Sequence, residues 1–387
     1  MSDRYHIRAD TTPDSPHDQF IARGCFTVNR PTRARTIDLS GYRLSAGMVN
    51  AHDHLELNHF PRTKFREVYD NAHQWGDDVD AQLNQSPYFD LRQYRLADRL
   101  FIGGLKNLLC GATTVAQHGA PHRMLFSRDF PVTVLRRYGW AHSLHFSTEE
   151  EIVTSYRRTP PTAPWFIHLA EGTDALADGE YQRLKALGCI GANTVIVHGV
   201  GLSEADIDDA SRSVRGLVWC PSTNQYLLGA SAHIAQWHEC GGTVALGSDS
   251  RLTADGDLGD EISAGITQGR TQGITREQVM VMVGVQSARL LGLSDVGHLR
   301  AGAHADFVVN WHPQRSRIAL IVRGGIPQIG DPALMAHFPD VQTVACQLDG
   351  VEKRLNSRLA RRIHRSTLKE QGLEVAELPS GKRFFFF

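Results

Sequence analysis

Short apolar runs alternate with amphipathic stretches through most of the chain. From Leu44 onward, runs rich in β-branched and aromatic residues are separated by segments with helical spacing. Such alternation is typical of a parallel sheet covered by helices. We expect strands at residues 48–54, 113–116, 165–170, 194–198, 217–220 and 244–248, and helices at 90–109, 149–158, 176–187, 204–212, 232–239 and 276–291. The third strand is expected within 132–146, and the pattern does not locate the fourth strand separately from it.

The two ends of the chain have a different pattern. Residues 1–45 carry short alternating pieces such as 20–28, and residues 299–309 lead through a turn into another strand. A helix is expected near 353–366, and the long loop 55–89 could act as a lid. A chain of 387 residues fits a barrel of about 250 residues with an accessory module. We therefore expect β-pieces from both ends to flank a barrel.

Four of the expected strands end in side chains that can bind a metal. The runs 48–54, 165–171, 194–198 and 244–249 end in His52 and His54, in His168, in His198, and in Asp249. Parallel α/β barrels build their active sites at the C-terminal ends of their strands. One such run would be weak evidence, but four in series indicate a metal-dependent hydrolase.

The spacing of the first two histidines predicts a metal clamp. Side chains two positions apart on a strand point to the same side, so His52 and His54 face one point while Asp53 faces away. Imidazole suits zinc and iron, and a mixed set of histidines and carboxylates suits a divalent ion that activates water. His168 can supply a third nitrogen, and Asp249 can bind the ion and the water together.

Two further residues are placed for proton transfer and substrate contact. Glu171 lies three residues after His168, where a loop can fold it over the metal as the base that takes a proton from water and the acid that delivers it to the leaving group. His198 is either a ligand or a hydrogen-bonding group beside the attacked atom. The second role is preferred, since four protein ligands are already available.

The sequence between the metal-binding runs favours one ion. A second ion in such sites is often bridged by a modified lysine on the fourth strand. The lysines between His54 and His168 are Lys64, in the loop after the first strand, and Lys106, in the helix before the second. Cys110 also precedes the second strand. No lysine or cysteine bridge is therefore expected.

These motifs together resemble the amidohydrolase superfamily, in particular its cytosine deaminase, guanine deaminase and triazine hydrolase branch. The matching segments are 47–54, 168–171, 197–199, 220–224, 246–250 and 303–309, so the resemblance spans residues 40 to about 310. It implies an α/β fold, a distorted (β/α)8 TIM barrel with a small β-sandwich domain made from both chain ends. The implied divisions are residues 1–45 and 301–387 for the sandwich, with the terminal helix in the latter, and 46–300 for the barrel.

The resemblance also implies roles for individual residues. One divalent ion, with zinc favoured over iron, would be held by His52, His54, His168 and Asp249. Glu171, His198 and Asp249 would carry the catalysis, with Glu171 shuttling protons. We expect substrate contacts from His198, from His118 at the end of the second strand, and from Asn224 after the seventh.

The composition of the chain argues against two classes of partner, nucleic acids and membranes. A net charge of −1 with 21% charged residues argues against a nucleic-acid-binding surface, and no apolar run approaches the 18 or so residues of a membrane span. None of the six cysteines lies in a C-x-x-C pair, so we expect reduced thiols and a cytoplasmic protein. The phenylalanine tail 384–387 is given no function.

Three functions fit these observations. The first is a deaminase that acts on an amino-substituted N-heterocycle, a small molecule, through a metal-activated water. The second is the same site with another leaving group, namely chloride, a thioether or the C–N bond of a cyclic amide. The third is a catalytically inactive binding protein on the same fold. A homodimer is left open.

Overall fold

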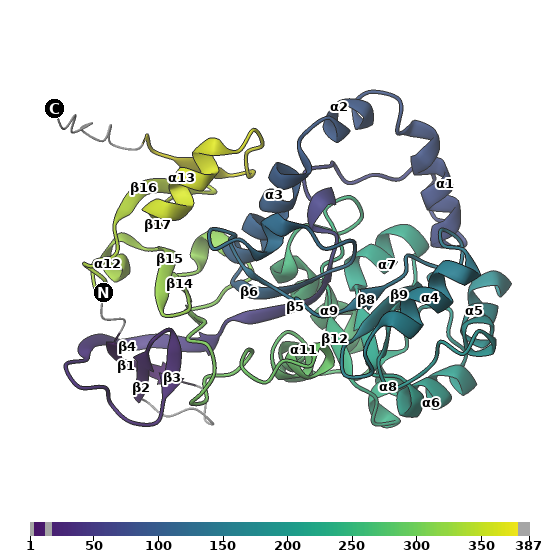
Figure 1. The fold of residues 1–387 in the computed structure, drawn as a ribbon, viewed down its shortest axis with the longest axis horizontal. Coiled ribbons are helices and arrows are strands. Elements are labelled where there is room, and N and C mark those ends of the chain that lie inside the picture. The colour runs from purple at the N-terminus through teal and green to yellow at the C-terminus, as the bar shows by residue number, and fades with distance from the viewer. Residues whose placement is uncertain (1–3, 12–17, 378–387) are drawn as a thin grey trace.

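The computed structural model describes residues 4–11 and 18–377 of the chain (Figure 1). A region of strands and helices holds the middle of the sequence, and a sheet region made of strands from residues 4–46 and 307–375 lies beside it. Within the described residues, the helices are all too short or too polar to cross a membrane. All six cysteines are unpaired, as expected.

Eight strands of the central region follow the predicted order. They form a parallel sheet of five, in the order β12 (Val244–Leu246), β11 (Gly216–Trp219), β10 (Thr194–His198), β9 (Trp165–Leu169) and β8 (Gly139–Trp140), and a parallel sheet of three, in the order β5 (Met48–Asp53), β6 (Ala112–Gln117) and β7 (Thr133–Val134). A parallel bridge between Asp53 and Asp249 links the two sheets at one side. The expected third and fourth strands are β7 and β8.

Helices separate these strands along the chain. They are α1 (Ala72–Gln82), α2 (Tyr88–Arg92), α3 (Leu96–Leu109), α4 (Glu149–Arg158), α5 (Ala175–Ala186), α6 (Glu204–Ser213), α7 (Pro221–Leu228), α8 (Ile234–Glu239), α9 (Leu258–Thr271), α10 (Arg276–Val281) and α11 (Val285–Leu291), with short 3-10 turns η1 (Leu55–Leu57) and η2 (Arg123–Phe126). Buried side chains of both the strands and the helices share one large core that includes Trp165, Trp219 and Trp237. The predicted α/β class is confirmed.

Both ends of the chain enter one ten-stranded sheet. Its order is β18 (Leu373–Val375), β16 (Thr343–Leu348), β17 (Val351–Asn356), β15 (Ile326–Gly330), β14 (Leu320–Arg323), β13 (Phe307–Val309), β4 (Arg35–Ala46), β1 (Arg4–Thr11), β2 (Asp18–Ala22) and β3 (Cys25–Thr27), with η3 (Arg315–Arg317), α12 (Pro332–Met335) and α13 (Ser357–Arg365) beside it. The antiparallel pair of β4 and β13 joins the two chain ends. The expected association of both ends is therefore present, as one hydrogen-bonded sheet.

The prediction of a single helix at 276–291 is wrong. It divides into α10 and α11 because Gly284, at φ −123° and ψ −112°, leaves the helical conformation. The helix expected at 90–109 also divides, because Arg95 is extended at φ −59° and ψ 134°. The helical spacing of apolar residues continues across both breaks, so the sequence pattern did not predict them.

Two further boundaries differ from expectation. The helix expected at 353–366 begins only at Ser357, because residues 351–356 pair with β16 as strand β17. The expected loop 55–89 contains η1, helix α1 and the start of α2. A one-turn or mildly amphipathic helix leaves a weak periodic signal, so these elements were not anticipated.

Candidate metal centre

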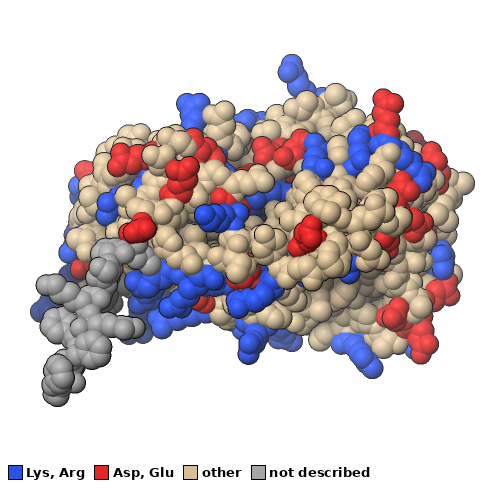
Figure 2. Space-filling model, turned by 90° about the horizontal axis from the view of Figure 1, so that it is seen from above, with Lys and Arg blue, Asp and Glu red and all other residues tan. Residues whose placement is uncertain are grey.

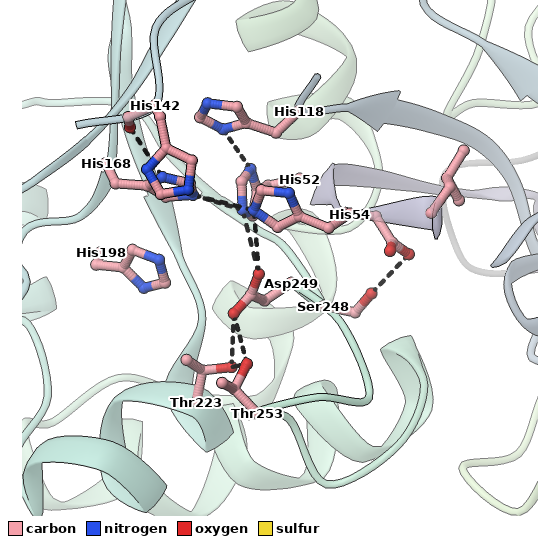
Figure 3. A network of polar contacts seen from close by, with 12 residues as sticks. His52, His54, His118, His142, His168, His198, Thr223, Ser248, Asp249 and Thr253 are labelled. Carbon is pink, nitrogen blue, oxygen red and sulfur yellow. Dashed lines mark hydrogen bonds and ion pairs between the residues drawn. The ribbon is translucent and has the colours of Figure 1, made fainter. Parts of the chain in front are cut away.

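Three imidazole nitrogens and one carboxylate oxygen meet at the carboxyl ends of the central strands (Figure 3). The Nε2 atoms of His54 and His168 are 3.2 Å apart, and those of His168 and His52 are 3.4 Å apart. Oδ1 of Asp249 lies 3.5 Å from Nε2 of both His52 and His54. Four ligands held about 2.1 Å from one tetrahedral ion are about 3.4 Å from one another. The four donor atoms therefore have the spacing that a single divalent ion requires.

Hydrogen bonds on the far side of two imidazoles leave their lone pairs facing this point. Nδ1 of His168 donates to the carbonyl oxygen of His142 at 2.9 Å. Nε2 of His118 donates to the carbonyl oxygen of Ala141 at 3.0 Å, so its Nδ1 accepts from Nδ1 of His52 at 3.3 Å. The Nε2 atoms of His52 and His168 then present lone pairs to each other. A cation between them would relieve that repulsion.

Burial keeps these imidazoles neutral, as metal ligands must be. It lowers the pKa of His52, and together with the neighbouring histidines it lowers the pKa of His118 and His168 well below the usual value. One nitrogen from each of His52, His54, His118 and His168 lies within 4.8 Å of the others. The histidine nitrogens and the carboxylate oxygen of Asp249 therefore fit a divalent ion such as zinc, which prefers ligands of these two kinds.

Asp249 is aimed at the imidazoles by two hydroxyl groups. Its Oδ2 accepts hydrogen bonds from Oγ1 of Thr253 at 2.7 Å and from Oγ1 of Thr223 at 3.2 Å, which leaves Oδ1 for the histidines. The backbone N–H groups of His54 and Asp249 donate to the carbonyl oxygens of Asp249 and His52 at 2.9 and 3.1 Å. These bonds hold the end of β5 against the segment after β12.

Glu171 and His198 lie next to each other beside this cluster. Oε2 of Glu171 is 3.4 Å from Nε2 of His198. Nδ2 of Asn224 donates to Nδ1 of His198 at 2.9 Å, so the ring proton of His198 is on Nε2 and faces the carboxylate. Burial lowers the pKa of His198 to about 3, which keeps it neutral. This tautomer supports the interpretation of His198 as a hydrogen-bond donor rather than a metal ligand.

The carboxyl group of Glu171 is set up to hold a proton. Burial first, and then the charges of Asp249 and Glu180, raise its pKa well above the usual value. Ala170, with φ at 54°, turns the chain before Glu171, and its N–H donates to Oε2 of the buried Glu180 at 2.6 Å. The N–H of Ala72 donates to the carbonyl oxygen of Glu171 at 2.8 Å. Helix α5 and the loop before α1 therefore fix the backbone that carries Glu171.

A buried charged pair lies behind the metal-binding histidines. Asp53 points away from them, as predicted, and its Oδ2 is 2.9 Å from Nζ of Lys106; neither side chain is exposed to solvent. Oδ2 also accepts hydrogen bonds from Asn107 at 2.7 Å and from Ser248 at 3.1 Å. The amide of Asn58 donates to Oδ1 at 2.8 Å. This network joins β5, α3 and the segment that carries Asp249.

A cavity of about 310 Å³ opens beside the cluster. It is lined by five of the six candidate residues for metal binding and catalysis, namely His54, His168, Glu171, His198 and Asp249, and also by His118. Trp75, Trp140 and Phe146 add flat apolar surfaces. His52, with its side chain fully buried, lies below the floor. The volume is at the small end of the range of about 300–1,000 Å³ for ligand pockets.

The residues predicted to contact substrate have other partners in the structure. Both ring nitrogens of His118 are used, by His52 and by Ala141, although the ring also lines the cavity. Asn224 is fully buried behind His198 and is not among the residues that line the cavity. A substrate contact by either residue stays a prediction.

Sequence reasoning missed three ionisable residues of the cavity wall. They are Glu56 on η1, His73 on α1 and Glu180 on α5. Glu56 lies two residues after His54, and this proximity was an available signal. No local signal marks Glu180, because α5 was expected only as a covering helix. Helix α7, which carries Thr223 and Asn224, was also missed.

The outer surface has mixed charge. Figure 2 shows acidic and basic side chains over most of one face, with a gathering of basic side chains at its lower left. The expected absence of a nucleic-acid partner stays a prediction.

Comparisons with known proteins show which family part of the chain resembles. Residues 164–327 match the model of the Amidohydrolase family. This match confirms the resemblance predicted from the sequence motifs. It is 30% identical over 194 residues to a 5-methylthioadenosine/S-adenosylhomocysteine deaminase of Desulfitobacterium hafniense, a match that covers 46% of this chain and 43% of the relative. The match thus spans less than half of that relative's length.

Solved structures extend the similarity to the whole fold. An adenosine deaminase from Xanthomonas campestris with bound zinc has a TM-score of 0.66 at 16% identity, over 87% of this chain and 97% of that one. Atrazine chlorohydrolase from Arthrobacter aurescens, complexed with zinc, has a TM-score of 0.65 at 16% identity, over 84% and 94%. At this identity the likeness concerns the fold.

Replacing His118 with phenylalanine is expected to weaken zinc binding about 10- to 100-fold. The substitution keeps a flat ring but removes the acceptor that fixes the Nδ1 proton of His52. Zinc affinity is measured by competition with a chromogenic chelator, and His337→Phe, at an exposed position, is the control. Unchanged zinc affinity in the His118 variant would show that His52 does not depend on this hydrogen bond.

Proposed function

We propose that the chain is a divalent-metal-dependent aminohydrolase that releases ammonia from an amino-substituted N-heterocycle. The observation that carries this proposal is the meeting of three imidazole nitrogens and the Asp249 carboxylate beside Glu171 and His198, at one end of a cavity. The deaminase named among the relatives and the zinc-containing neighbours in fold support it.

The residues divide the chemistry among them. Held by His52, His54, His168 and Asp249, a divalent ion would supply an activated water and polarise the atom under attack. Glu171 takes a proton at its carboxylate and delivers it to the leaving nitrogen, a role suited to a carboxyl group with a raised pKa.

His198 and its neighbours stabilise the charge that develops. The Nε2–H of His198 donates to the substituent of the attacked carbon, and Asn224 keeps the proton on that nitrogen.

The same residues suit a second reaction. Chloride, a thioether or the nitrogen of a cyclic amide can replace ammonia as the leaving group without any change in the residues around the ion. The neighbour named as a chlorohydrolase keeps this alternative open. A third alternative, an inactive binding protein, is disfavoured because no member of the expected constellation is missing.

The test is metal-dependent turnover. The purified protein is loaded with zinc, and in parallel with iron, and is assayed for ammonia, chloride and thiol release from substituted purines, pyrimidines and triazines. We expect one bound ion per chain and ammonia release. Stoichiometric metal without turnover of any compound would favour the inactive binding protein, and release of another leaving group alone would favour the second reaction.

Removing the ion should abolish activity and lower stability together. An ion held at 1,000 times its Kd stabilises the native state by about 4 kcal/mol, so dialysis against a chelator is expected to lower Tm. Re-addition of zinc should restore both turnover and Tm. Turnover that persists in the chelated protein would contradict a metal-dependent mechanism.

We also propose the finer architecture. The eight central strands close into a distorted (β/α)8 barrel over residues 46–300, and residues 1–45 and 301–387 form an accessory β-sandwich. The bridge between Asp53 and Asp249 supports closure at one side, and the pairing of β4 with β13 supports a shared accessory domain. Zinc as the ion, a cytoplasmic location and a homodimer belong to the same proposal.

A further inference from the structure

The wall of the cavity is acidic and contains no cationic side chain that is always charged. Among the described residues that line it, the ionisable ones are histidines and carboxylates, with neither lysine nor arginine. Asp249 would offset one of the two charges of a divalent ion, while the raised pKa of Glu171 favours its neutral form. Two more carboxylates, Glu56 and Glu180, then leave the cavity with an excess of negative charge.

Glu56 has one oxygen available to a ligand. Its Oε2 accepts a hydrogen bond from Nε2 of Gln117 at 2.6 Å, while Oε1 of Gln117 accepts the N–H of Leu55 at 2.9 Å. Gln117 is thereby held at both ends of its amide, and it fixes the direction of Glu56. No described residue donates a hydrogen bond to Oε1 of Glu56, so this oxygen is an acceptor without a protein donor.

Glu180 is the second acceptor in the wall. It is 4% exposed, and its Oε2 is used by the N–H of Ala170. Its Oε1 lies 3.1 Å from Nε2 of His73 but accepts no well-directed hydrogen bond from the described residues. A buried carboxylate oxygen without a donor is costly, and a ligand that brings an N–H or O–H group would satisfy it.

The rest of the wall suits a flat ring. The indole N–H of Trp75 already donates to the carbonyl oxygen of Thr63 at 3.0 Å, so Trp75 offers its apolar surface. Phe146 packs edge-on against the ring of His142, with 5.0 Å between centroids. Trp140 completes the aromatic lining. Flat apolar surfaces with a few hydrogen-bond acceptors favour a donor-rich heterocycle.

We infer that the cavity selects a neutral or cationic amino-heterocycle that donates hydrogen bonds to Glu56 and Glu180, and that it rejects the same ring when it carries a carboxylate or phosphate. This inference rests on the proposed function and narrows its substrate class. A ligand anion would meet like charge with no arginine or lysine in the cavity wall to pair with it, because Arg99, which interacts with Glu56, is not among the lining residues. Such repulsion discriminates against the anionic ligand.

The test uses matched ligand pairs on zinc-loaded Glu171→Gln protein, which should bind without turnover. The pairs are 9-(2-hydroxyethyl)adenine with 9-(carboxymethyl)adenine, and the hydroxyethylamino and carboxymethylamino derivatives of diaminotriazine and of an aminopyrimidine. Calorimetry is expected to show that the neutral member binds at least about tenfold more tightly in each ring class that binds. The variant keeps Glu56 and Glu180, the two carboxylates on which the inference depends.

Glu56→Gln, added to the same background, should reduce the preference for the neutral member at least threefold. Glu374→Gln, at an exposed position on β18, is the matched control and should not change it. Equal or tighter binding of the carboxylate members, an unchanged ratio in the Glu56 variant, or no binding of any neutral member would overturn the inference. Ammonia release by the wild-type protein tests the proposed function separately: binding preference without turnover contradicts that function alone, and equal turnover of both members contradicts this inference alone.

Discussion

Replacing Glu171 with glutamine is expected to lower kcat at least about 100-fold while the protein keeps its metal ion. Transfer of a proton by a positioned carboxyl group contributes about 100- to 10,000-fold to rate, and glutamine cannot take or deliver that proton. The carboxylate lies 3.4 Å from His198 and is not one of the four donor atoms that meet at the metal position. Its loss should therefore leave the ligands in place.

Two measurements separate this role from a structural one. Metal analysis of the purified variant should give the wild-type stoichiometry, and kcat should fall without a matching rise in KM. Glu149→Gln makes the same chemical change at an exposed ion pair with Arg183, and it should leave kcat unchanged. A Glu171 variant with normal turnover would contradict proton transfer, and one that lost its metal would indicate that Glu171 helps to hold the ion.

The local order of the motifs explains why the sequence predicted the metal-binding residues. His52 and His54 are two positions apart on β5, and strand geometry alone sets their common direction. Each of His168, His198 and Asp249 ends or closely follows a buried strand, so the topology of a parallel sheet brings them to one end. The positions of these side chains therefore depend on short segments of the chain, whose structure can be predicted from the sequence pattern.

Contacts between distant segments could not be predicted in this way. Arg251 follows the eighth strand, a position that would favour the cavity, but it donates two hydrogen bonds to the buried Glu370, 119 residues away. The acceptor role of Glu180 depends on which face of α5 turns inward. Asn224 was expected in the cavity and instead orients His198 from behind. Tertiary packing determines each of these contacts, and the spacing of residues along the chain does not predict tertiary packing.

Lys106 gives the clearest case of such a contact, and it leads to the second large effect. A lysine in an amphipathic helix is ordinarily exposed. Here α3 buries it completely, with Nζ 2.9 Å from Oδ2 of Asp53 and 3.1 Å from Oγ of Ser248. Asp53 lies between His52 and His54, and Ser248 directly precedes Asp249. The ammonium group therefore supports both segments that carry the metal ligands.

Replacing Lys106 with methionine is expected to lower the free energy of unfolding of the metal-free protein by about 3–5 kcal/mol, because it leaves the Asp53 carboxylate buried without its counter-charge. The measurement is the urea midpoint with its slope. Lys185→Met removes one partner of an exposed pair with Asp209 and should cost no more than about 1 kcal/mol. Adding Asp53→Asn to the Lys106 variant removes the unpaired charge and should recover part of the loss. A Lys106 variant as stable as the Lys185 control would mean that the surrounding amides alone stabilise Asp53.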